Sequence, residues 1–442
     1  MTFEDLNLTK PLLNALADLG YTTPTTIQQK VFSVTMSGQD VCGIAQTGTG
    51  KTFAYLLPSL RQLQFSKERL PQLLIIVPTR ELVVQVMEET KKLSAYMTVE
   101  TVGVYGGGNI KIQMAEVKNG ADIIVATPGR LVDLIMNGSL KVKAVKKLII
   151  DEVDEMLNLG FRAQLTNILD LIPQRRQNLL FSATITQHVE LLMKTYFNNP
   201  VRVEAAPAGT PLENIEQRAY LVPNFYTKVN LLDLLLEENE DMTKVLVFTA
   251  TKKLADQLFA QMEVAYLNKV GVIHSNKEQN NRFNTVRQFQ EGNFRIIIAT
   301  DIIARGLDVA EVSHVINFDI PETPENYIHR IGRTGRADKR GIAISFITEA
   351  EKEFRDNIEE LMNYQIPELP LPENLKISEV LTEDEQPKIF MKSIEPKRPK
   401  PEDVGPAFHE KKAKNQKVNV RRNHAEEKMR KYGRPIKRSG KK

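Results

Sequence analysis

The sequence contains a single cysteine, Cys42, among 442 residues, so no intramolecular disulfide can form. It lacks any apolar run near the roughly 18 residues that a membrane-spanning helix requires. The N-terminus also lacks a signal-like apolar segment. These absences argue against a disulfide-stabilised secreted protein and against a membrane protein. We expect a cytoplasmic chain with no membrane partner.

Aliphatic residues are scarce at the C-terminal end. Only six of the residues in 391–442 are Ile, Leu, Val or Phe, too few for a hydrophobic core, and we expect a disordered tail. The same segment holds 18 Lys and Arg against 6 Asp and Glu, a net charge of +12, whereas the rest of the chain has a net charge of −8. A basic tail on an acidic body indicates a polyanionic partner.

The chain as a whole is 42% hydrophobic and 26% charged, which is typical of a globular protein, and its length suggests two or three domains. Short apolar runs alternate with amphipathic stretches on both sides of the Ala-, Pro- and Gly-rich segment 204–213. This alternation predicts an α/β fold of two tandem doubly wound parallel-sheet domains. We place the domains at 1–203 and 214–370, a flexible linker at 204–213, and an extension with the basic tail at 371–442.

The predicted elements follow from the apolar patterns. Strands are expected at 41–45, 73–77, 122–127, 147–151 and 178–184, and at 244–250, 270–275, 295–301, 314–319 and 341–347. Helices are expected at 80–93, 160–172, 252–262 and 278–290. Functional residues of open parallel sheets gather at the carboxyl ends of the strands, and the motifs below follow these strands.

The segment AQTGTGKT, residues 45–52, follows a predicted strand and opens a helix. Gly48 and Gly50 allow the backbone to curl so that successive N–H groups bind phosphate oxygens. Lys51 adds a cation, and the Thr52 hydroxyl can bind Mg²⁺. A glycine-rich turn with no ligand is the structural alternative.

A second segment, LIIDEVDEML at 148–157, runs from a buried strand into three acids. Buried carboxylates are costly unless a cation, a hydrogen bond or a proton meets them. Because this strand belongs to the same predicted sheet, Asp151 can hold Mg²⁺, largely through water, and Glu152 can orient the attacking water. The two segments together therefore predict a site for a phosphate-bearing ligand with Mg²⁺. The alternative is a strand that ends in a solvated acidic turn.

With these two segments in place, the chain resembles the DEAD-box ATP-dependent RNA helicases over roughly residues 1–370. The resemblance implies two RecA-like domains, with ATP and Mg²⁺ as the cofactors. It also implies RNA-stimulated ATP hydrolysis that is coupled to domain closure and to local unwinding of short RNA duplexes. A site that is split between two domains is complete only when they close, so ATP and RNA should each raise the affinity for the other.

The resemblance assigns an ATP site. The segment GYTTPTTIQ within residues 1–29 matches the adenine-reading motif, in which Gln28 would bond the adenine edge and Tyr21 or Phe3 would pack nearby. The implied nucleotide-binding residues are Phe3, Tyr21, Gln28, Ala45, Gln46, Thr47, Gly48, Thr49, Gly50, Lys51, Thr52 and Asp308. The implied catalytic residues are Lys51, Asp151, Glu152, Arg333 and Arg336, and the metal would lie at Thr52 and Asp151.

The segment HRIGRTGR, residues 329–336, matches the arginine-finger motif. Guanidinium groups suit a γ-phosphate because they stay charged and present a planar fork of donors. The spacing of His329, Arg333 and Arg336 predicts one helical face if a helix begins at Pro324. A solvated basic turn is the alternative.

The resemblance also implies a coupling set and an RNA surface. Asp154 would link the phosphate site to Ser182, Thr184 and His329. RNA would be bound through its backbone, without sequence preference, by Pro78, Thr79, Arg80, Gly106, Gly107, Thr127, Pro128, Gly129, Arg130, Thr249, Gln279, Arg282, Thr300 and Arg305.

The sequence departs from the family pattern in four places. Ala45 replaces the first glycine of the phosphate segment, which is acceptable if that position needs no positive φ. Val153 replaces alanine, and strand alternation predicts that it faces away from the phosphates. Ile302-Ile303 replaces valine-alanine, and Ser275-Asn276-Lys277 replaces glycines after His274, changes that the sequence leaves unexplained.

Three functions are consistent with these motifs: an RNA-dependent ATPase that unwinds duplexes, a DNA helicase, and a non-catalytic RNA clamp. The adenine and arginine-finger motifs together favour RNA over DNA, and retention of Lys51, Glu152 and Arg333 disfavours the clamp. We expect a monomer. The short basic tail resembles bacterial members of the RhlE type, whereas the RNA, the pathway (such as ribosome assembly or RNA decay) and any protein partner are not encoded in recognisable form.

Overall fold

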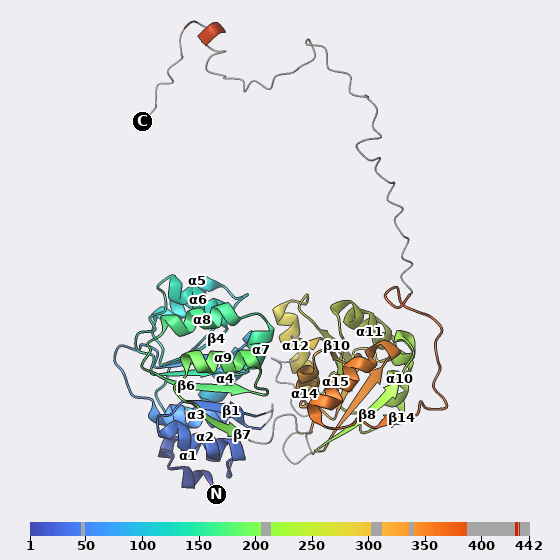
Figure 1. Cartoon of the computed structure of the whole chain (residues 1–442), viewed down its shortest axis with the longest axis horizontal. Coiled ribbons are helices and arrows are strands. Elements are labelled where there is room, and N and C mark those ends of the chain that lie inside the picture. Colours follow the sequence, from blue (N-terminus) through green and yellow to red (C-terminus); the bar gives the residue numbers. More distant parts are fainter. Residues whose placement is uncertain are drawn as a thin grey trace, which may run out of the picture. The chain divides into compact units, whose positions relative to one another are not determined.

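The computed structural model describes residues 1–45, 49–204, 214–301, 312–335, 340–386, 429–431 and 433, without the side chains of Gln279 and Asn280. Among these residues the chain forms two seven-stranded sheets, one in each predicted domain (Figure 1). All strand pairs are parallel. The predicted fold class is therefore confirmed.

The two sheets share one topology. The first has the strand order β3-β4-β2-β5-β6-β1-β7, and the second has β10-β11-β9-β12-β13-β8-β14. If the second set is counted from β8, the two orders are identical, so the architecture is duplicated although the sequence shows no repeat. The strands are β1 (Val41–Ile44), β2 (Leu73–Ile76), β3 (Thr101–Val104), β4 (Ile123–Ala126), β5 (Lys147–Ile150), β6 (Gln177–Ser182), β7 (Val201–Glu204), β8 (Ile215–Leu221), β9 (Val245–Phe248), β10 (Val270–Ile273), β11 (Ile296–Ala299), β12 (His314–Asn317), β13 (Gly341–Ile347) and β14 (Glu368–Leu369).

Helices cover both faces of each sheet (Figure 1). In the first domain they are α1 (Lys10–Asp18), α2 (Thr26–Met36), α3 (Lys51–Gln62), α4 (Arg80–Leu93), α5 (Ile110–Lys118), α6 (Pro128–Met136), α7 (Val153–Asn158), α8 (Arg162–Leu171) and α9 (Gln187–Tyr196). In the second domain they are α10 (Phe225–Glu238), α11 (Lys252–Ala265), α12 (Gln279–Gln290), α14 (Pro324–Ile331) and α15 (Lys352–Met362).

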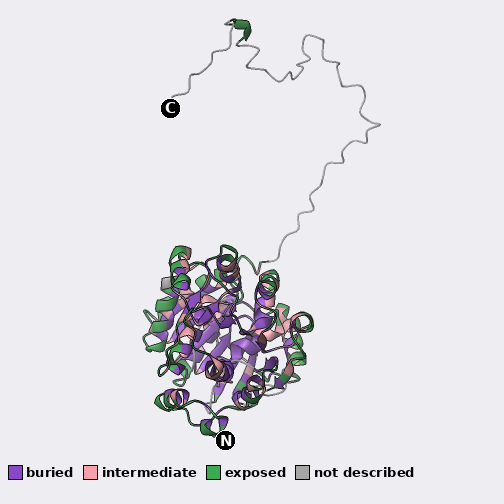
Figure 2. Cartoon of the chain, turned by 90° about the vertical axis from the view of Figure 1, so that its left-hand side faces the viewer, coloured by how far each residue is buried: buried purple, intermediate pink, exposed green. Residues whose placement is uncertain are grey.

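The strands are continuous apolar runs because both of their faces are buried. In β2, Leu73 and Ile75 pack with residues of α1 to α4, whereas Leu74 and Ile76 pack on the other face with residues of α6 to α9. The second sheet repeats this alternation. Val245 of β9 packs with residues of α10 and α11, whereas Leu246 packs on the other face with residues of α12, α14 and α15. Figure 2 shows the buried residues concentrated in the sheets and on the inner sides of the helices.

The predicted elements are present with small shifts at their ends. The helix predicted at 80–93 matches α4. The helix predicted at 160–172 corresponds to α8, which begins at Arg162 and is preceded in the chain by the separate short helix α7. The elements that were not predicted are strands β3, β7, β8 and β14 and helices α1, α2, α5, α6, α7, α9, α10 and α15. β3 and β7 are edge strands, and their mixed composition carries less apolar signal than a central strand does.

The chain continues along the second domain beyond the boundary predicted at residue 370. We call residues 371–386 the C-terminal strap. Leu371 and Leu375 pack against the core beneath α10, and the Asn224 and Asn230 amides of that region donate to strap carbonyls at 2.5 and 2.6 Å. Of the linker predicted at 204–213, Glu204 instead ends strand β7. The rest of the linker and nearly all of the basic tail lie outside the described residues, so those predictions stay untested.

Candidate functional site

Gln28 connects the predicted adenine motif to the phosphate segment. Its Nε2 donates to the Gly50 carbonyl at 3.2 Å, its Oε1 accepts from the Thr25 amide at 2.9 Å, and Thr25 Oγ1 donates to the Thr49 carbonyl at 2.9 Å. Gly50 has φ +89°, and a Cβ there would lie 2.5 Å from Gln28 Nε2. Glycine is therefore required at this turn for its conformation and for the space that Gln28 occupies.

The two aromatic candidates for the adenine have different environments. Phe3 is 3% exposed and packs in the core with the strands of the first sheet. Tyr21 is 52% exposed, with its ring 5.3 Å from that of Phe53 in an edge-to-face arrangement. Of the two, Tyr21 has the accessible ring surface.

Lys51 is the first residue of α3 and is buried, with 7% of its surface exposed. Among the described residues its Nζ has no hydrogen-bond partner. A helix N-terminus with a buried, unpaired ammonium group is suited to bind phosphate. Ala45 is buried at the end of β1, and Gln46, Thr47 and Gly48 lie outside the described residues.

The acids of 151–154 follow β5, and all three interact electrostatically with the Lys51 ammonium group. Burial raises the pKa of Asp151, and Lys51 opposes that shift. Burial also raises the pKa of Glu152 to about 7, again opposed by Lys51 and less strongly by Arg333. Glu152 has φ +54°, a left-handed conformation that is uncommon for a residue with a side chain and is found at functional sites.

The described residues contain no group of three or more His, Cys, Asp or Glu side chains arranged to hold a metal. Mg²⁺ does not need such a cage, because it is usually held by one or two carboxylates and by substrate phosphates. The buried Asp151 with Thr52 one residue after Lys51 fits this donor requirement.

Asp154 is bonded to the segment that ends β6. Its Oδ2 accepts hydrogen bonds from the amides of Ala183 and Thr184 at 3.1 and 3.0 Å and from Thr184 Oγ1 at 3.0 Å. Burial acts to raise the pKa of Asp154, but His329, Lys51 and the bonds from Thr184 hold it below its usual value. Ser182 is buried and donates to the Thr184 carbonyl at 2.7 Å. The predicted coupling residues are thus brought together, and their coupling role stays a prediction.

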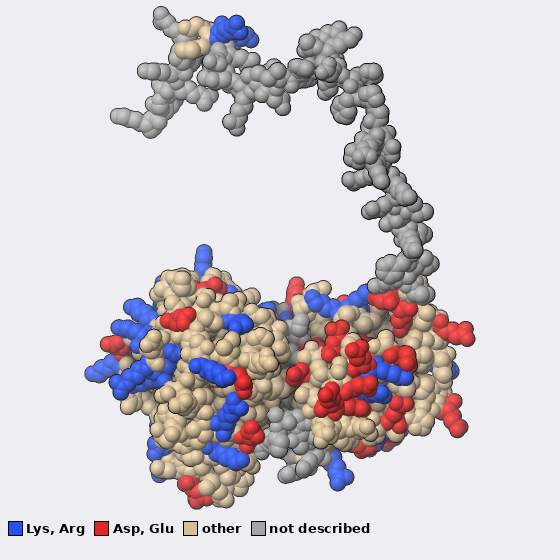
Figure 3. All heavy atoms as spheres, in the orientation of Figure 1, with Lys and Arg blue, Asp and Glu red and all other residues tan. Residues whose placement is uncertain are grey.

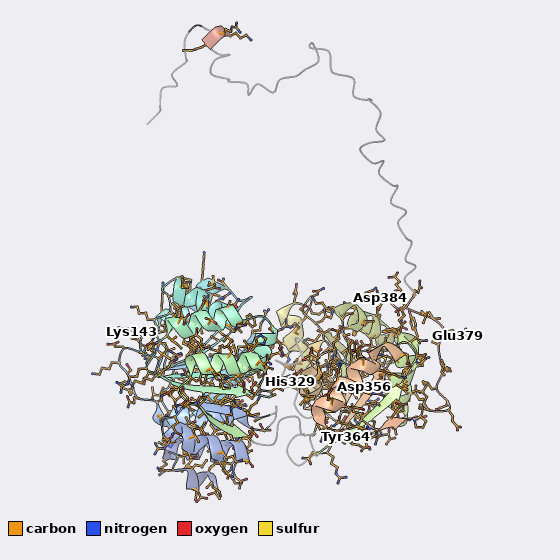
Figure 4. All side chains as sticks on the ribbon, viewed as in Figure 1. Lys143, His329, Asp356, Tyr364, Glu379 and Asp384 are labelled. Atoms are coloured by element: carbon orange, nitrogen blue, oxygen red, sulfur yellow. The ribbon has the colours of Figure 1, made fainter. Side chains whose placement is uncertain are left out.

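The arginine-finger segment is only partly helical. Helix α14 ends at Ile331, with Gly332 as its C-cap, so the prediction that His329 and Arg333 share a helical face is wrong. His329 lies in the last turn of α14 (Figure 4), and Arg333 is buried in the turn that follows. The glycine breaks the helix because its helical form is entropically costly. Arg336 lies outside the described residues.

Predicted RNA-binding residues of the first domain gather at the carboxyl ends of β2, β3 and β4. Thr79 caps α4 by accepting from the Leu82 amide at 3.3 Å, and Thr127 Oγ1 accepts from the Gly106 amide at 3.4 Å. Gly107 has φ +81°, where a Cβ would lie 2.6 Å from Arg80 Nη1. The other residues of this set are Pro78, which is buried after β2, and Pro128, Gly129 and Arg130 in the first turn of α6.

In the second domain, Thr249 and Thr300 are buried directly after β9 and β11. Arg282 of α12 forms an ion pair with Glu81 of α4, so the guanidinium group predicted to bind RNA has a protein partner here. Arg305, Asp308 and the Gln279 side chain lie outside the described residues.

Sequence analysis missed Arg330, which is 2% exposed. Its Nε and Nη2 donate to the two oxygens of Asp301 at 2.5 and 2.8 Å, and its Nη1 donates to the Asp319 carbonyl at 2.6 Å. Arg330 therefore ties the strand ends of β11 and β12 together. Its position within HRIGRTGR was a signal, but nothing local distinguishes a buried arginine from an exposed one.

The structure explains two departures from the family pattern. Val153 is fully buried in the core, as predicted, but it is the first residue of α7 and not part of a strand. The turn after His274 is fastened to α11, since Lys252 Nζ donates to Asn276 Oδ1 at 3.1 Å and Lys277 Nζ lies 3.0 Å from Asp256 Oδ1. Ile302-Ile303 lies outside the described residues.

A phosphate-binding turn and paired acids at the ends of parallel strands, in a duplicated α/β fold, define a nucleotide-hydrolysing protein with tandem RecA-like domains. The family model described as DEAD/DEAH box helicase matches residues 25–192, and the helicase conserved C-terminal domain matches residues 227–338. The chain belongs to the DEAD-box ATP-dependent RNA helicases, which are ATP-hydrolysing enzymes.

Relatives and solved structures agree with this assignment. The chain is 38% identical over 377 residues to the ATP-dependent RNA helicase DbpA of Bacillus subtilis, covering 85% of this chain and 78% of the relative. It is 39% identical over 350 residues to CshA of Geobacillus kaustophilus, covering 79% and 74%. S. cerevisiae Dbp5 bound to RNA and ADP BeF3 is similar with a TM-score of 0.75 at 27% identity, covering 84% of this chain and 95% of Dbp5. Mss116 bound to ssRNA and UDP-BeF has a TM-score of 0.77 at 28% identity, covering 84% and 79%.

Within the described part of the chain, no helix combines the length and apolar character needed to cross a membrane.

Proposed function

We propose that this chain hydrolyses ATP at the carboxyl ends of β1 and β5, and that RNA stimulates the reaction. One observation carries the proposal. The buried ammonium group of Lys51 has no hydrogen-bond partner among the described residues, while two acids with raised pKa values, Asp151 and Glu152, lie within its electrostatic reach. Such a site is incomplete without a phosphate ligand.

The proposed roles follow from this chemistry. Lys51 and the N-terminus of α3 bind the β- and γ-phosphates. Glu152 orients the attacking water and accepts its proton, because a pKa near 7 suits a general base at neutral pH. Arg333 stabilises charge on the transferred phosphate. Asp151 and Thr52 would hold Mg²⁺, and the bound ion would neutralise charge on the phosphate oxygens.

The same proposal links hydrolysis to RNA. Asp154 bonds Thr184, so a shift at the phosphate site acts directly on the segment that follows β6. The predicted RNA contacts follow β2, β3 and β4 in one domain and β9 and β11 in the other. We infer that closure of the domains grips and bends one strand, which separates short duplexes, and that loss of the γ-phosphate reopens them.

Finer assignments are proposed on other grounds. The relatives of this chain include DbpA, CshA and RhpA, which are not RhlE. The RhlE-like subtype is therefore proposed from the short basic tail alone. A monomer in the cytoplasm, and a sequence-independent grip on RNA, are expected from the family and the composition.

The test compares ATP turnover by the full chain in the absence of nucleic acid, with single-stranded RNA and with single-stranded DNA. We expect strong stimulation by RNA and weak or no stimulation by DNA. Equal stimulation by DNA would favour the DNA-helicase alternative, and no turnover under any condition would favour the RNA clamp.

A further inference from the structure

The second domain contains a buried cluster of three charges that none of the predicted sites includes. The side chain of Lys228, in α10, is 3% exposed, and its Nζ lies 3.1 Å from Asp319 Oδ1 and 2.9 Å from Glu351 Oε2. Asp319 and Glu351 follow β12 and β13, at the carboxyl edge of the sheet. Buried ion pairs rarely add stability over an apolar packing, so a specific geometric role is the stronger reason for one.

Asp319 uses its second carboxylate oxygen to hold a loop. Its Oδ2 accepts from the Ala250 amide at 2.9 Å. Ala250 lies between Thr249, a predicted RNA-binding residue, and Thr251, whose side chain caps α11 by accepting from the Leu254 amide at 3.2 Å. One carboxylate therefore joins Lys228 to the loop 249–251.

The backbone of Asp319 reaches a second predicted RNA segment. Its carbonyl accepts from Arg330 Nη1 at 2.6 Å, and Arg330 pairs with both oxygens of Asp301. Asp301 directly follows Thr300, another predicted RNA-binding residue. Asp319 thus lies at the junction of two segments that must keep a fixed spacing to follow an RNA backbone.

We propose that Lys228 and Asp319 are positioning residues for RNA binding. The ion pair fixes the Asp319 carboxylate, which in turn holds loop 249–251 in the conformation that binds RNA. Their side chains are 3% and 11% exposed, so they act through the loop and do not contact RNA themselves. This inference rests on the proposed RNA-stimulated activity.

The test uses Lys228→Met and Asp319→Asn in the full chain. Asparagine has one acceptor oxygen where aspartate has two, so it cannot replace both the Oδ1 that contacts Lys228 and the Oδ2 that accepts from the Ala250 amide. We expect the RNA concentration for half-maximal stimulation to rise roughly threefold to tenfold, with turnover at saturating RNA near wild type, because a misplaced binding group weakens binding more than chemistry. Lys228→Arg keeps the charge and should restore most of the RNA affinity.

Glu351→Gln is the matched control. It removes the negative charge that pairs with Lys228, and it weakens the bonds that Glu351 Oε2 accepts from the Thr348 amide and hydroxyl, each at 2.8 Å. The described contacts of Glu351 do not include loop 249–251. Its melting temperature should fall while its RNA requirement stays within twofold of wild type. If Lys228→Met and Asp319→Asn behave like this control, or lower only the saturated turnover, the cluster is merely structural. Absence of RNA stimulation in the wild-type protein would overturn the proposed function before any variant is compared.

Discussion

At the scale of single residues, burial gives ionisable groups two different outcomes in this protein. Lys51, Asp151 and Glu152 are gathered at one end of the first sheet, where charges of both signs offset one another's cost. Lys147 lies at the opposite end of the same strand that precedes Asp151, and its Nζ donates to Gln62 Oε1 at 2.5 Å. Burial alone lowers the pKa of Lys147 to about 7. Lys51, Asp151 and Glu152 form a candidate site, whereas the burial of Lys147 destabilises the folded protein.

The catalytic assignment predicts different failures for two substitutions. Lys51→Ala should weaken ATP binding and turnover together, because it removes the cation that binds phosphate. Glu152→Gln should retain ATP binding and lose turnover by roughly 10²-fold or more, since it removes the proposed general base. Nucleotide binding and single-turnover hydrolysis measure the two effects separately. Near-normal hydrolysis by Glu152→Gln would show that the role given to Glu152 is wrong.

The lowered pKa of Lys147 should make the free energy of unfolding depend on pH. Its ordinary pKa is 10.5, so between about pH 7 and 10.5 the unfolded chain binds this proton and the folded chain does not. The contribution of Lys147 to the free energy of unfolding therefore rises with pH between about pH 7 and 10.5. Lys147→Met should stabilise the protein at pH 7 by about 2 kcal/mol, and the gain should shrink toward pH 10.

The control for this experiment is Lys146→Met. Lys146 is the exposed neighbour, and its Nζ makes a similar bond to Gln64 Oε1 at 2.8 Å. Denaturant unfolding across the pH series should show no pH-dependent gain for this variant. A constant gain for Lys147→Met at all pH values would mean that the lysine is not held neutral in the folded protein.

At the scale of elements, the C-terminal strap behaves as part of the second domain. Glu385 Oε1 accepts from the Phe225 amide at 2.6 Å, which satisfies a free N–H at the start of α10. Its Oε2 accepts from the Thr382 amide and hydroxyl at 2.8 and 2.9 Å. The strap then lies against the first turn of α11, where Lys253 Nζ is 2.9 Å from Asp384 Oδ2; Figure 4 labels Asp384. The strap therefore fastens two helices from outside the sheet.

Removal of this cap should destabilise the domain. Glu385→Ala is expected to lower the free energy of unfolding by about 1–2 kcal/mol, as loss of helix caps does. Glu383→Ala is the control, because Glu383 is exposed and its pair with Lys253, at 3.6 Å, should contribute little to stability in water. Denaturant unfolding of both variants checks the difference. Equal losses would contradict the capping role.

At the scale of the whole molecule, charge is divided between the body and the tail. The body carries a net charge of −8, and Figure 3 shows acidic side chains gathered over α15 of the second domain, whose acids are Glu353, Asp356, Glu359 and Glu360. The tail carries +12. We therefore expect general attraction to a polyanion to come mainly from the tail, and specific backbone contacts to come from the predicted RNA-binding residues at the strand ends.

Truncation after Phe390 should keep both domains and the strap, and should weaken RNA binding. The dependence of log affinity on log salt should become flatter, by about 0.7 for each phosphate that the tail neutralises on a single strand. Phe408 and Tyr432 are the only aromatic residues in 391–442, so base stacking should contribute little.

A full-length variant with the tail Lys and Arg changed to Gln controls for chain length in this experiment. It should reproduce the flatter salt dependence. An unchanged slope in both proteins would mean that the tail only keeps the chain soluble.

Much of the fold and the candidate site could be predicted from the sequence, because both are encoded locally. Apolar runs such as 73–77 identify strands that are buried on both faces, and Gly50 allows the turn before α3 to take a backbone conformation that other residues rarely adopt. The acids that follow residue 150 could be placed beside that turn because parallel strands end at one edge of a sheet.

Only the tertiary structure decided which polar groups meet. Its contacts join residues that are far apart in sequence. Arg330 pairs with Asp301, Asp319 accepts from an amide of loop 249–251, and Glu385 caps α10. The tertiary structure also decided the different exposure of Phe3 and Tyr21, which the local sequence pattern does not reveal. Periodicity and turn chemistry act between neighbours along the chain, whereas the partner of a buried charge is set by the packing of whole elements.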